Sequence, residues 1–377
     1  MNQRMVSLDA FRGFTIAAML LVNNPGDWGH LYGPLSHAKW DGWTVTDGIF
    51  PFFVFISGIS MTLSLGRRAA LGDRPQDLLL QTFRRGGIII GIGLLLNFTP
   101  AFDLAQVRIP GVLQRLGLCT ILTAPIVLYW QWRGQMLWLV GLLVAYSIVE
   151  LRVSVPDAQG VWHTGSLQPG EDVGAWLDRW LMDGHLWRSS KTWDPEGLLS
   201  TVPAVASQLA GVIAGHWLAC KRKPIEKCVG LLVAGLSLLW IGQAVGAWSM
   251  PVNKSLWSPA YAIFMTGWAC LFFSVFFGLL EAVAYPPLRR MATRLATPLV
   301  IFGLNALFLF ALSGLIAKML SFIKVSPELT LKAWLYTPIQ TSGLDPVNAS
   351  LLFAVLFVVA MFAIAWAMWR RRWFVKV

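Results

Sequence analysis

The stretch VNASLLFAVLFVVAMFAIAWAMW, residues 347–369, decides the fold class of this chain. It contains no Asp, Glu, Lys or Arg, and it exceeds the roughly 20 residues that an α-helix needs to cross the apolar core of a bilayer. Similar apolar stretches recur along the whole chain, and we expect about ten transmembrane helices. The predicted spans are 10–24, 44–66, 86–98, 110–129, 135–151, 197–219, 228–249, 259–283, 297–319 and 347–369.

The composition of the 377-residue chain also indicates a membrane protein. Hydrophobic residues make up 56% of the chain and charged residues only 13%, with a mean hydropathy of +0.60. Soluble domains carry roughly 25% charged residues, so a soluble enzyme, a disordered tail protein and a disulfide scaffold are excluded. The sequence lacks the alternation of apolar and polar residues that strands would require. We therefore expect an all-α, polytopic transmembrane helical bundle forming a single domain over residues 1–377.

The charge distribution predicts the orientation of the bundle. The net charge of +11 arises from 30 Lys and Arg against 19 Asp and Glu, and most basic residues stand in short clusters between apolar stretches. This pattern is typical of cytoplasmic loops, so we expect both termini in the cytoplasm, a lipid bilayer as surroundings and no nucleic-acid partner. No small-residue cleavage site follows the first span, and we expect no cleavable signal. The polar segment 152–196 is predicted to form a small external cap.

Polar side chains are frequent in the first eighth of the chain. Asp9 and Arg12 stand three residues apart, so an ion pair that fixes the helix end and a ligand site are equally open readings. Asn23 ends the first span, His37 lies in the following loop, and Asp47 opens the second span. An Asn, a His and an Asp at one membrane face predict either a proton-coupled transporter or an enzyme with a general base. Periodicity does not choose between these two.

Other polar residues fall inside or beside later spans. Gln114 and Arg115 lie in the fourth span, where an arginine needs a carboxylate, a carbonyl or an anionic ligand. Lys254 stands at the mouth of the eighth span. Asn305 lies in the ninth span, where hydrogen bonding to a neighbouring helix is an equal alternative to cavity lining. We expect no metal site, because the spacing of the external histidines matches no ligand signature.

These polar blocks, in this order, resemble the heparan-α-glucosaminide N-acetyltransferase family of transmembrane acyltransferases. The resemblance covers most of the chain and is weak over 152–191 and beyond Ser321. It predicts a bacterial inner-membrane member without the large N-terminal lumenal domain of the animal proteins. The matching blocks are Ser7–Gly13, Leu21–Asn23, His37–Gly42, Thr44, Asp47, Phe50, Pro51, Arg108–Leu116, Asp194–Leu199 and Asn253–Trp257.

The resemblance implies transfer of an acetyl group from cytoplasmic acetyl-CoA to an amino sugar of the glucosamine type, or a glycan bearing one, on the far side of the membrane. A histidine of the first external loop is the active-site residue of the family, and His37 matches it. Asn23 matches the asparagine placed near the acyl group. A homodimer is a possible assembly.

The chemistry of the matched residues is compatible with this role. N-acetylation needs a neutral amine, and a histidine with an ordinary pKa near 6.5 suits the removal of the amine proton. Asp47 can hold the His37 ring in the correct tautomer, and Asn23 or a Trp indole can stabilise the developing negative charge. Direct transfer and an acetyl-His37 intermediate both fit.

Coenzyme A carries several negative charges, so its binding requires basic and polar contacts. We expect these from Arg12, Arg115, Gln114, Lys254, Trp40 and Asn305. Two alternative functions stay open, a proton-coupled secondary transporter and an O-acyltransferase acting on an envelope glycan. Turnover of acetyl-CoA separates the transporter from the enzymes, and stability of the product to mild alkali separates an amide from an ester.

Overall fold

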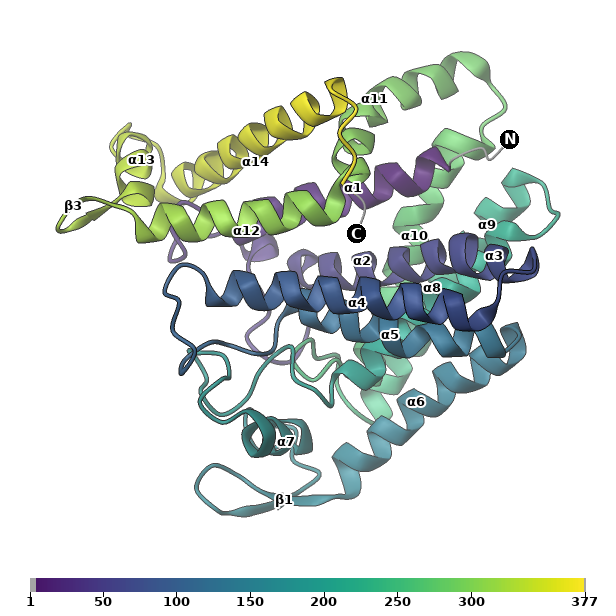
Figure 1. Ribbon diagram of the computed structural model, residues 1–377, viewed down its shortest axis with the longest axis horizontal. Coiled ribbons are helices and arrows are strands. Elements are labelled where there is room, and N and C mark those ends of the chain that lie inside the picture. Colours follow the sequence, from purple (N-terminus) through teal and green to yellow (C-terminus); the bar gives the residue numbers. More distant parts are fainter. Residues whose placement is uncertain (1–4, 376–377) are drawn as a thin grey trace.

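A computed structural model describes residues 5–375 and confirms the all-α, polytopic architecture (Figure 1). Within these residues, nine helices are long and apolar enough to cross a membrane, and one bent helix pair raises the number to ten if it counts as a span. The nine spans are α1 (Val6–Asn23), α2 (Val45–Met61) continued by η2 (Thr62–Gly66) and α3 (Arg67–Ala70), α4 (Pro75–Phe98), α5 (Val112–Tyr129), α6 (Trp132–Arg152), α8 (Thr201–Ala219), α9 (Pro224–Trp248), α10 (Pro259–Phe277) continued by η3 (Gly278–Ala282), and α14 (Pro346–Arg370).

The third predicted span, 86–98, starts too late. Helix α4 begins at Pro75, whose missing N–H is not needed in the first turn of a helix. Arg84 and Arg85 interrupt the apolar pattern without interrupting the helix, since the backbone hydrogen bonds of a helix do not depend on side-chain polarity. The helix is therefore long enough to span on its own.

The ninth predicted span, 297–319, is broken. Helices α11 (Pro286–Leu304) and α12 (Ala306–Phe322) meet at Asn305 with a bend of 72°. The Asn305 side chain binds the chain just after α14: its Nδ2 donates to the Trp373 carbonyl over 3.0 Å, and its Oδ1 accepts from the Val375 amide over 2.8 Å. Both bonds go to the backbone just after α14 and not to a neighbouring helix, which was one of the two readings from the sequence.

Helices α1, α2, α5, α8 and α10 form the buried centre of the bundle, and α6 and α9 lie at its periphery. The backbones of α2 and α8 touch where Gly58 faces Gly211. An added Cβ would lie 2.0 Å from the Gln208 carbonyl oxygen at the first position and 2.1 Å from the Phe55 carbonyl oxygen at the second. Small residues allow this close approach between membrane helices, in the absence of a hydrophobic driving force between them.

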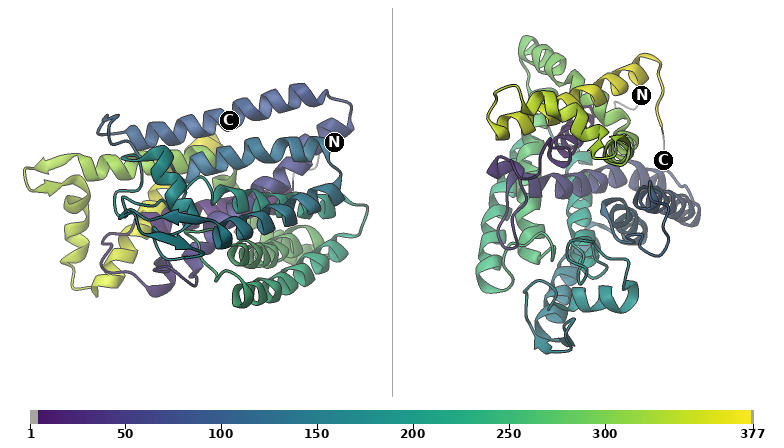
Figure 2. Two further views of the ribbon diagram at one scale, coloured as in Figure 1. Left: turned by 90° about the horizontal axis from the view of Figure 1, so that it is seen from below. Right: turned by 90° about the vertical axis from the view of Figure 1, so that its left-hand side faces the viewer.

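The segment predicted as a cap folds into a small irregular unit. Strands β1 (Ser154–Pro156) and β2 (Trp162–Thr164) form an antiparallel hairpin. Asp172 is the N-cap of α7 (Val173–Met182), and its carboxylate accepts from the Ala175 amide. A second excursion contains β3 (Lys324–Ser326), β4 (Leu329–Thr330) and α13 (Leu331–Gln340), and the first loop contains η1 (Gly33–Leu35). Figures 1 and 2 show the cap and α13 at one end of the bundle, opposite the start of α1. We call this end the cap end and the opposite one the terminal end.

Candidate active site

His37, Asp47 and Lys254 lie in mutual contact near the cap end of the bundle. The His37 Nδ1 atom is 2.7 Å from Asp47 Oδ1 and 2.9 Å from the Lys254 ammonium nitrogen. The Lys254 nitrogen is also 3.4 Å from Asp47 Oδ1. The Asp47 side chain is 1% exposed, whereas the His37 side chain is 46% exposed. A buried carboxylate therefore holds an accessible imidazole and a lysine at the same oxygen atom.

The start of α2 positions Asp47. Thr44 is the N-cap, and Asp47 occupies the third helical position, so the two form a reciprocal capping box. Asp47 Oδ2 accepts from the Thr44 amide and the Ala38 amide, each over 3.0 Å. The Tyr261 hydroxyl donates to the Asp47 carbonyl over 2.7 Å. Because backbone amides occupy Oδ2, Oδ1 is the oxygen that faces His37.

The loop before α10 brings Lys254 to this carboxylate. Asn253 Nδ2 donates to Asp41 Oδ1 over 3.1 Å, and the Gly42 amide donates to the Val252 carbonyl over 2.8 Å. These contacts join the first loop to the 249–258 loop. Burial lowers the pKa of Lys254, while the carboxylates of Asp47 and Glu196 oppose that shift.

His37 Nδ1 has two partners that require opposite protonation states of this nitrogen. A carboxylate oxygen only accepts a hydrogen bond, so contact with Asp47 requires a proton on Nδ1. An ammonium group only donates, so contact with Lys254 requires a lone pair on the same nitrogen. The first arrangement leaves a lone pair on Nε2, which the Lys254 nitrogen also approaches at 3.4 Å, and the second places the ring proton on Nε2. Competition between Asp47 and Lys254 for Nδ1 therefore bears directly on whether His37 can act as a base through Nε2.

A second charged cluster lies where α5 meets the end of the cap. Arg108 donates to both carboxylate oxygens of Asp194 and to Glu196. These two carboxylates raise the pKa of Arg108 against the opposing effect of burial. Burial alone would raise the pKa of Glu196, but the charges of Arg108, Arg115 and Lys254 outweigh it and lower that pKa. Arg108 and Glu196 thus extend the charged region around Lys254.

Arg115 is enclosed by protein. Its guanidinium donates to the Gly197 carbonyl and to the Ser200 hydroxyl, and it lies 5.1 Å from the centre of the Trp257 ring. The residue is 1% exposed. Of the three partners expected for an arginine here, a carboxylate, a carbonyl or an anionic ligand, the structure shows a carbonyl, and these contacts favour a structural role. Gln114 is buried beside it, against Gly111.

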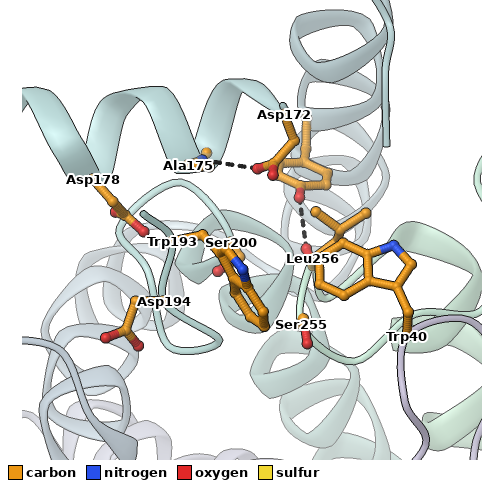
Figure 3. A pocket seen from close by; sticks show the side chains of 11 residues that line it. Trp40, Asp172, Ala175, Asp178, Trp193, Asp194, Ser200, Ser255 and Leu256 are labelled. Atoms are coloured by element: carbon orange, nitrogen blue, oxygen red, sulfur yellow. Dashed lines mark hydrogen bonds between the residues drawn. The ribbon is translucent and has the colours of Figure 1, made fainter. Parts of the chain in front are cut away.

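Trp40 faces the cap. Its indole donates to the Leu167 carbonyl over 2.8 Å and packs edge-to-face on Trp193 at 5.0 Å. Figure 3 shows the small cavity between them, which Asp172 and Asp178 also line. Its volume of about 10 Å³ leaves room for about one water molecule, so it is too small for a cofactor. Burial raises the pKa of Asp178 to about 7.

A large cavity opens at the cap end between α4, α12 and α14. Its volume is about 670 Å³, within the roughly 300–1,000 Å³ typical of ligand sites. Asn23 lines it, at the end of α1, and so does Arg108. Its other polar or aromatic residues are Asn24, Trp28, Asn97, Thr99, Gln106, Trp187, Arg188, Lys318, Ser321, Phe322, Lys332, Phe353 and Phe357.

A second large cavity, of about 560 Å³, opens towards the terminal end between α2, α4 and α12. Arg12 and Asn305 line it, whereas Arg115 and Lys254, which were expected to bind the donor together with them, do not. Arg12 also donates to Asp9 over 3.1 Å and to the Ser60 hydroxyl over 2.8 Å, so the Asp9–Arg12 ion pair is present. Further polar residues of this wall are Ser57, Ser60, Ser64, Arg68, Gln81, Thr82, Arg85, Thr120 and Gln208.

Six of the nine predicted site residues separate into three places, while Arg115, Gln114 and Trp40 lie outside them. His37, Asp47 and Lys254 form one contact cluster, Asn23 lines the cap-end cavity, and Arg12 with Asn305 lines the terminal-end cavity. Sequence reasoning missed the basic residues Arg68 and Arg85 at the terminal end and Arg188, Lys318 and Lys332 at the cap end. Arg85 carried a usable signal, since it interrupts an apolar stretch.

The fold and the site together define a polytopic membrane protein with a histidine, a carboxylate and a lysine in contact at one end of its bundle. Residues 4–173 match the family model described as heparan-alpha-glucosaminide N-acetyltransferase, catalytic. The chain is 27% identical over 358 residues to the heparan-alpha-glucosaminide N-acetyltransferase of Mus musculus and 29% identical over 366 residues to that of Homo sapiens. Each alignment covers 81% of this chain, and the predicted resemblance to this family is confirmed.

The chain spans about half the length of these two relatives, 53% of the mouse protein and 52% of the human one. The matched residues 4–173 include Asn23, His37 and Asp47, whereas Lys254 lies beyond them.

Proposed function

We propose that this protein is a membrane acetyltransferase that moves an acetyl group from acetyl-CoA to an amino sugar on the opposite side of the membrane. The observation that carries the proposal is the contact of His37 with the buried Asp47 over 2.7 Å. An accessible imidazole held by a buried carboxylate is the arrangement of a general base. The names of the mouse and human relatives support N-acetyl transfer as the reaction.

The terminal-end cavity is the proposed donor site. Arg12, Arg68 and Arg85 line it together with the hydroxyls of three serines, and coenzyme A carries phosphate groups that arginines bind through paired N–H donors. Asn305 forms part of the same wall but already binds the chain after α14. Under the predicted topology this cavity faces the cytoplasm, where acetyl-CoA is available.

The cap-end cavity is the proposed binding site for the acceptor sugar. His37 is not one of its lining residues, so the proposed reaction requires the sugar amine to extend from this cavity to the imidazole. Trp28 and Trp187 offer aromatic faces for a sugar ring, and Asn23 and Asn97 offer amide groups for its hydroxyls. Asn23 is exposed to this cavity, so it can also donate to the carbonyl oxygen of the acetyl group as negative charge develops there.

In the proposed reaction the amine nitrogen of the sugar attacks the thioester carbon. The new N–C bond forms, the C–S bond breaks, His37 Nε2 takes the proton from the amine, and the thiolate of coenzyme A leaves and is protonated. Asp47 holds Nδ1–H and leaves the lone pair on Nε2. A positioned base contributes roughly 10² to 10⁴-fold. A two-step route through acetyl-His37 uses the same residues.

The donor must pass an apolar cluster that separates the two cavities. Ile89, Leu113 and Leu116 are buried together, with Phe310 packed against them. Along α4 the cluster follows Arg85 and precedes Asn97, so it lies between the residues of the two cavities. The narrow pantetheine arm of coenzyme A is the part of the donor that can enter here, while the charged nucleotide stays behind.

The test is to incubate purified protein with labelled acetyl-CoA and a panel of amino sugars. Formation of an acetylated sugar that survives mild alkali supports N-acetyl transfer, and a product lost in alkali indicates an O-acyltransferase. Absence of any turnover, with proton-coupled uptake in vesicles, would favour a transporter. The bacterial inner membrane as location and the homodimer stay predictions.

A further inference from the structure

A third large cavity lies on the side of the bundle, away from the proposed donor and acceptor sites. It has a volume of about 490 Å³ and lies between α6, α8, α9 and α10. Its floor is formed by α8 and α10, and α6 and α9 form its walls. The lining is almost entirely apolar or small, with Met136, Leu139, Ala210, Ile213, Ala234 and Ile263 as examples.

This groove opens on the surface that a bilayer would cover. Helices α6 and α9 are among the least buried spans, and Figure 1 shows α6 at the edge of the bundle. Ala234 and Met136 line the groove and are exposed on its rim. An opening between transmembrane helices at this depth is surrounded by hydrocarbon, so the molecules that reach it are the acyl chains of lipids.

The terminal end of the groove carries concentrated positive charge. Trp217 lines the groove, and the guanidinium of Arg222 lies over its ring at 5.1 Å. Lys221 and Lys223 flank Arg222 in the same exposed turn between α8 and α9. Lys227 donates to the Leu218 carbonyl. The acid of this turn is Glu226, 3.8 Å from Arg222, so the turn keeps an excess of positive charge.

We propose that the groove binds one acyl chain of an anionic phospholipid, with the headgroup phosphate on the Arg222 turn. The chain would lie along Ala210 and Ala234, and Trp217 would mark the boundary between chain and headgroup. Basic clusters next to transmembrane helices attract anionic lipids, and an arginine can bind a phosphate through two N–H donors. This inference does not depend on the proposed acetyl transfer.

The experiment is native mass spectrometry of the detergent-purified full chain, titrated with phosphatidylglycerol and with phosphatidylcholine of the same acyl chains. We expect the wild type to bind phosphatidylglycerol roughly 10-fold more tightly, because the turn has several basic side chains. Ala234→Phe fills the groove and should weaken binding of both lipids by about 10-fold. Val233→Phe is the matched control, because Val233 is an exposed neighbour on α9 that does not line the groove.

A second variant removes positive charge from the turn between α8 and α9, by combining Arg222→Gln with Lys223→Gln. This double variant should lose the preference for phosphatidylglycerol while it still binds both lipids. Its control is Arg290→Gln combined with Arg294→Gln on α11, two exposed arginines outside the groove, which should keep the preference.

Three results would overturn the inference. The first is equal binding of both lipids by the wild type, and the second is unchanged binding in Ala234→Phe. The third is loss of a dimer in Ala234→Phe without loss of lipid, which would assign the groove to a second copy of the chain. A native-like melting temperature of each variant confirms that a lost lipid is not caused by unfolding.

Discussion

Replacement of Lys254 by Met tests the competition for His37 Nδ1. The substitution removes the ammonium 2.9 Å from Nδ1 and leaves Asp47 as the partner of the ring. The ring should then keep its proton on Nδ1, and the imidazolium form should become more stable because the nearby positive charge is gone. On acidification, the Lys254→Met variant should therefore lose activity at a higher pH than the wild type does.

The size of this shift follows from Coulomb's law. Two unit charges about 4 Å apart interact with roughly 1 kcal/mol in water and roughly 4 kcal/mol at an effective dielectric constant of about 20. Because the His37 side chain is 46% exposed, solvent screening favours the lower end of this range. A free energy of about 1.4 kcal/mol corresponds to one pH unit. We expect the acid limb of the profile to move up by about one unit.

The assay is kcat/KM for the acceptor between pH 5 and 9 at saturating acetyl-CoA, compared for wild type, Lys254→Met and Lys254→Arg. Lys254→Arg keeps the positive charge, so the acid limb of its pH profile should coincide with that of the wild type. The reasoning fails if Lys254→Met leaves the limb in place or moves it to lower pH. A raised KM for acetyl-CoA with an unmoved limb would instead return Lys254 to donor binding, as expected from the sequence.

Four further predictions concern the site, the cavities, the cap and the topology. His37→Ala should stay folded and lose roughly 10²-fold or more in kcat, and combining it with Asp47→Asn should cost little more, since the two act as one unit. Arg85→Ala should raise KM for acetyl-CoA with kcat unchanged, and an unaltered KM would remove Arg85 from the donor site. Folding raises the pKa of Asp178 from 3.8 to about 7, so the folded state binds more protons between these values and thermal stability should fall as pH rises from about 4 to 7. Asp178→Asn should flatten that slope in a melting series, and an unchanged slope would contradict the assignment. A cysteine placed at Ser166 should react with an impermeant probe only from outside the cell.

The helical spans could be predicted because hydropathy reports burial in lipid directly. The stretch 347–369 lies within α14, and the start of α5 at Val112 lies within two residues of its predicted position. The break at Asn305 was not predictable from hydropathy, because the residues on both sides are apolar and the Asn305 side chain bonds to Trp373 and Val375, about 70 positions further along the chain. Tertiary contacts of this kind leave no periodic signal.

Only part of the site was predictable, because some of its contacts join residues that are far apart in the chain. His37 and Asp47 are ten positions apart, and the capping signature around Thr44 indicates that Asp47 lies at a helix start near the loop. Lys254 is 217 positions from His37, and only the pairing of the first loop with the 249–258 loop brings them together. Charge alone suggested a cofactor contact for this lysine, whereas its position next to the imidazole suggests control of the ring proton.

Helix α1 connects the two proposed substrate sites. Arg12 lines the terminal-end cavity and Asn23 lines the cap-end cavity, and a helix rise of 1.5 Å per residue places them about 16 Å apart along the axis. A donor whose phosphates are held at Arg12 can deliver its acetyl group near Asn23 only through an extended arm of about that length. The arm has to pass Leu113 and Leu116, which are buried in the apolar cluster. Leu116 also lines the terminal-end cavity, so under the proposed function the pantetheine arm would meet this cluster directly on its way to Asn23.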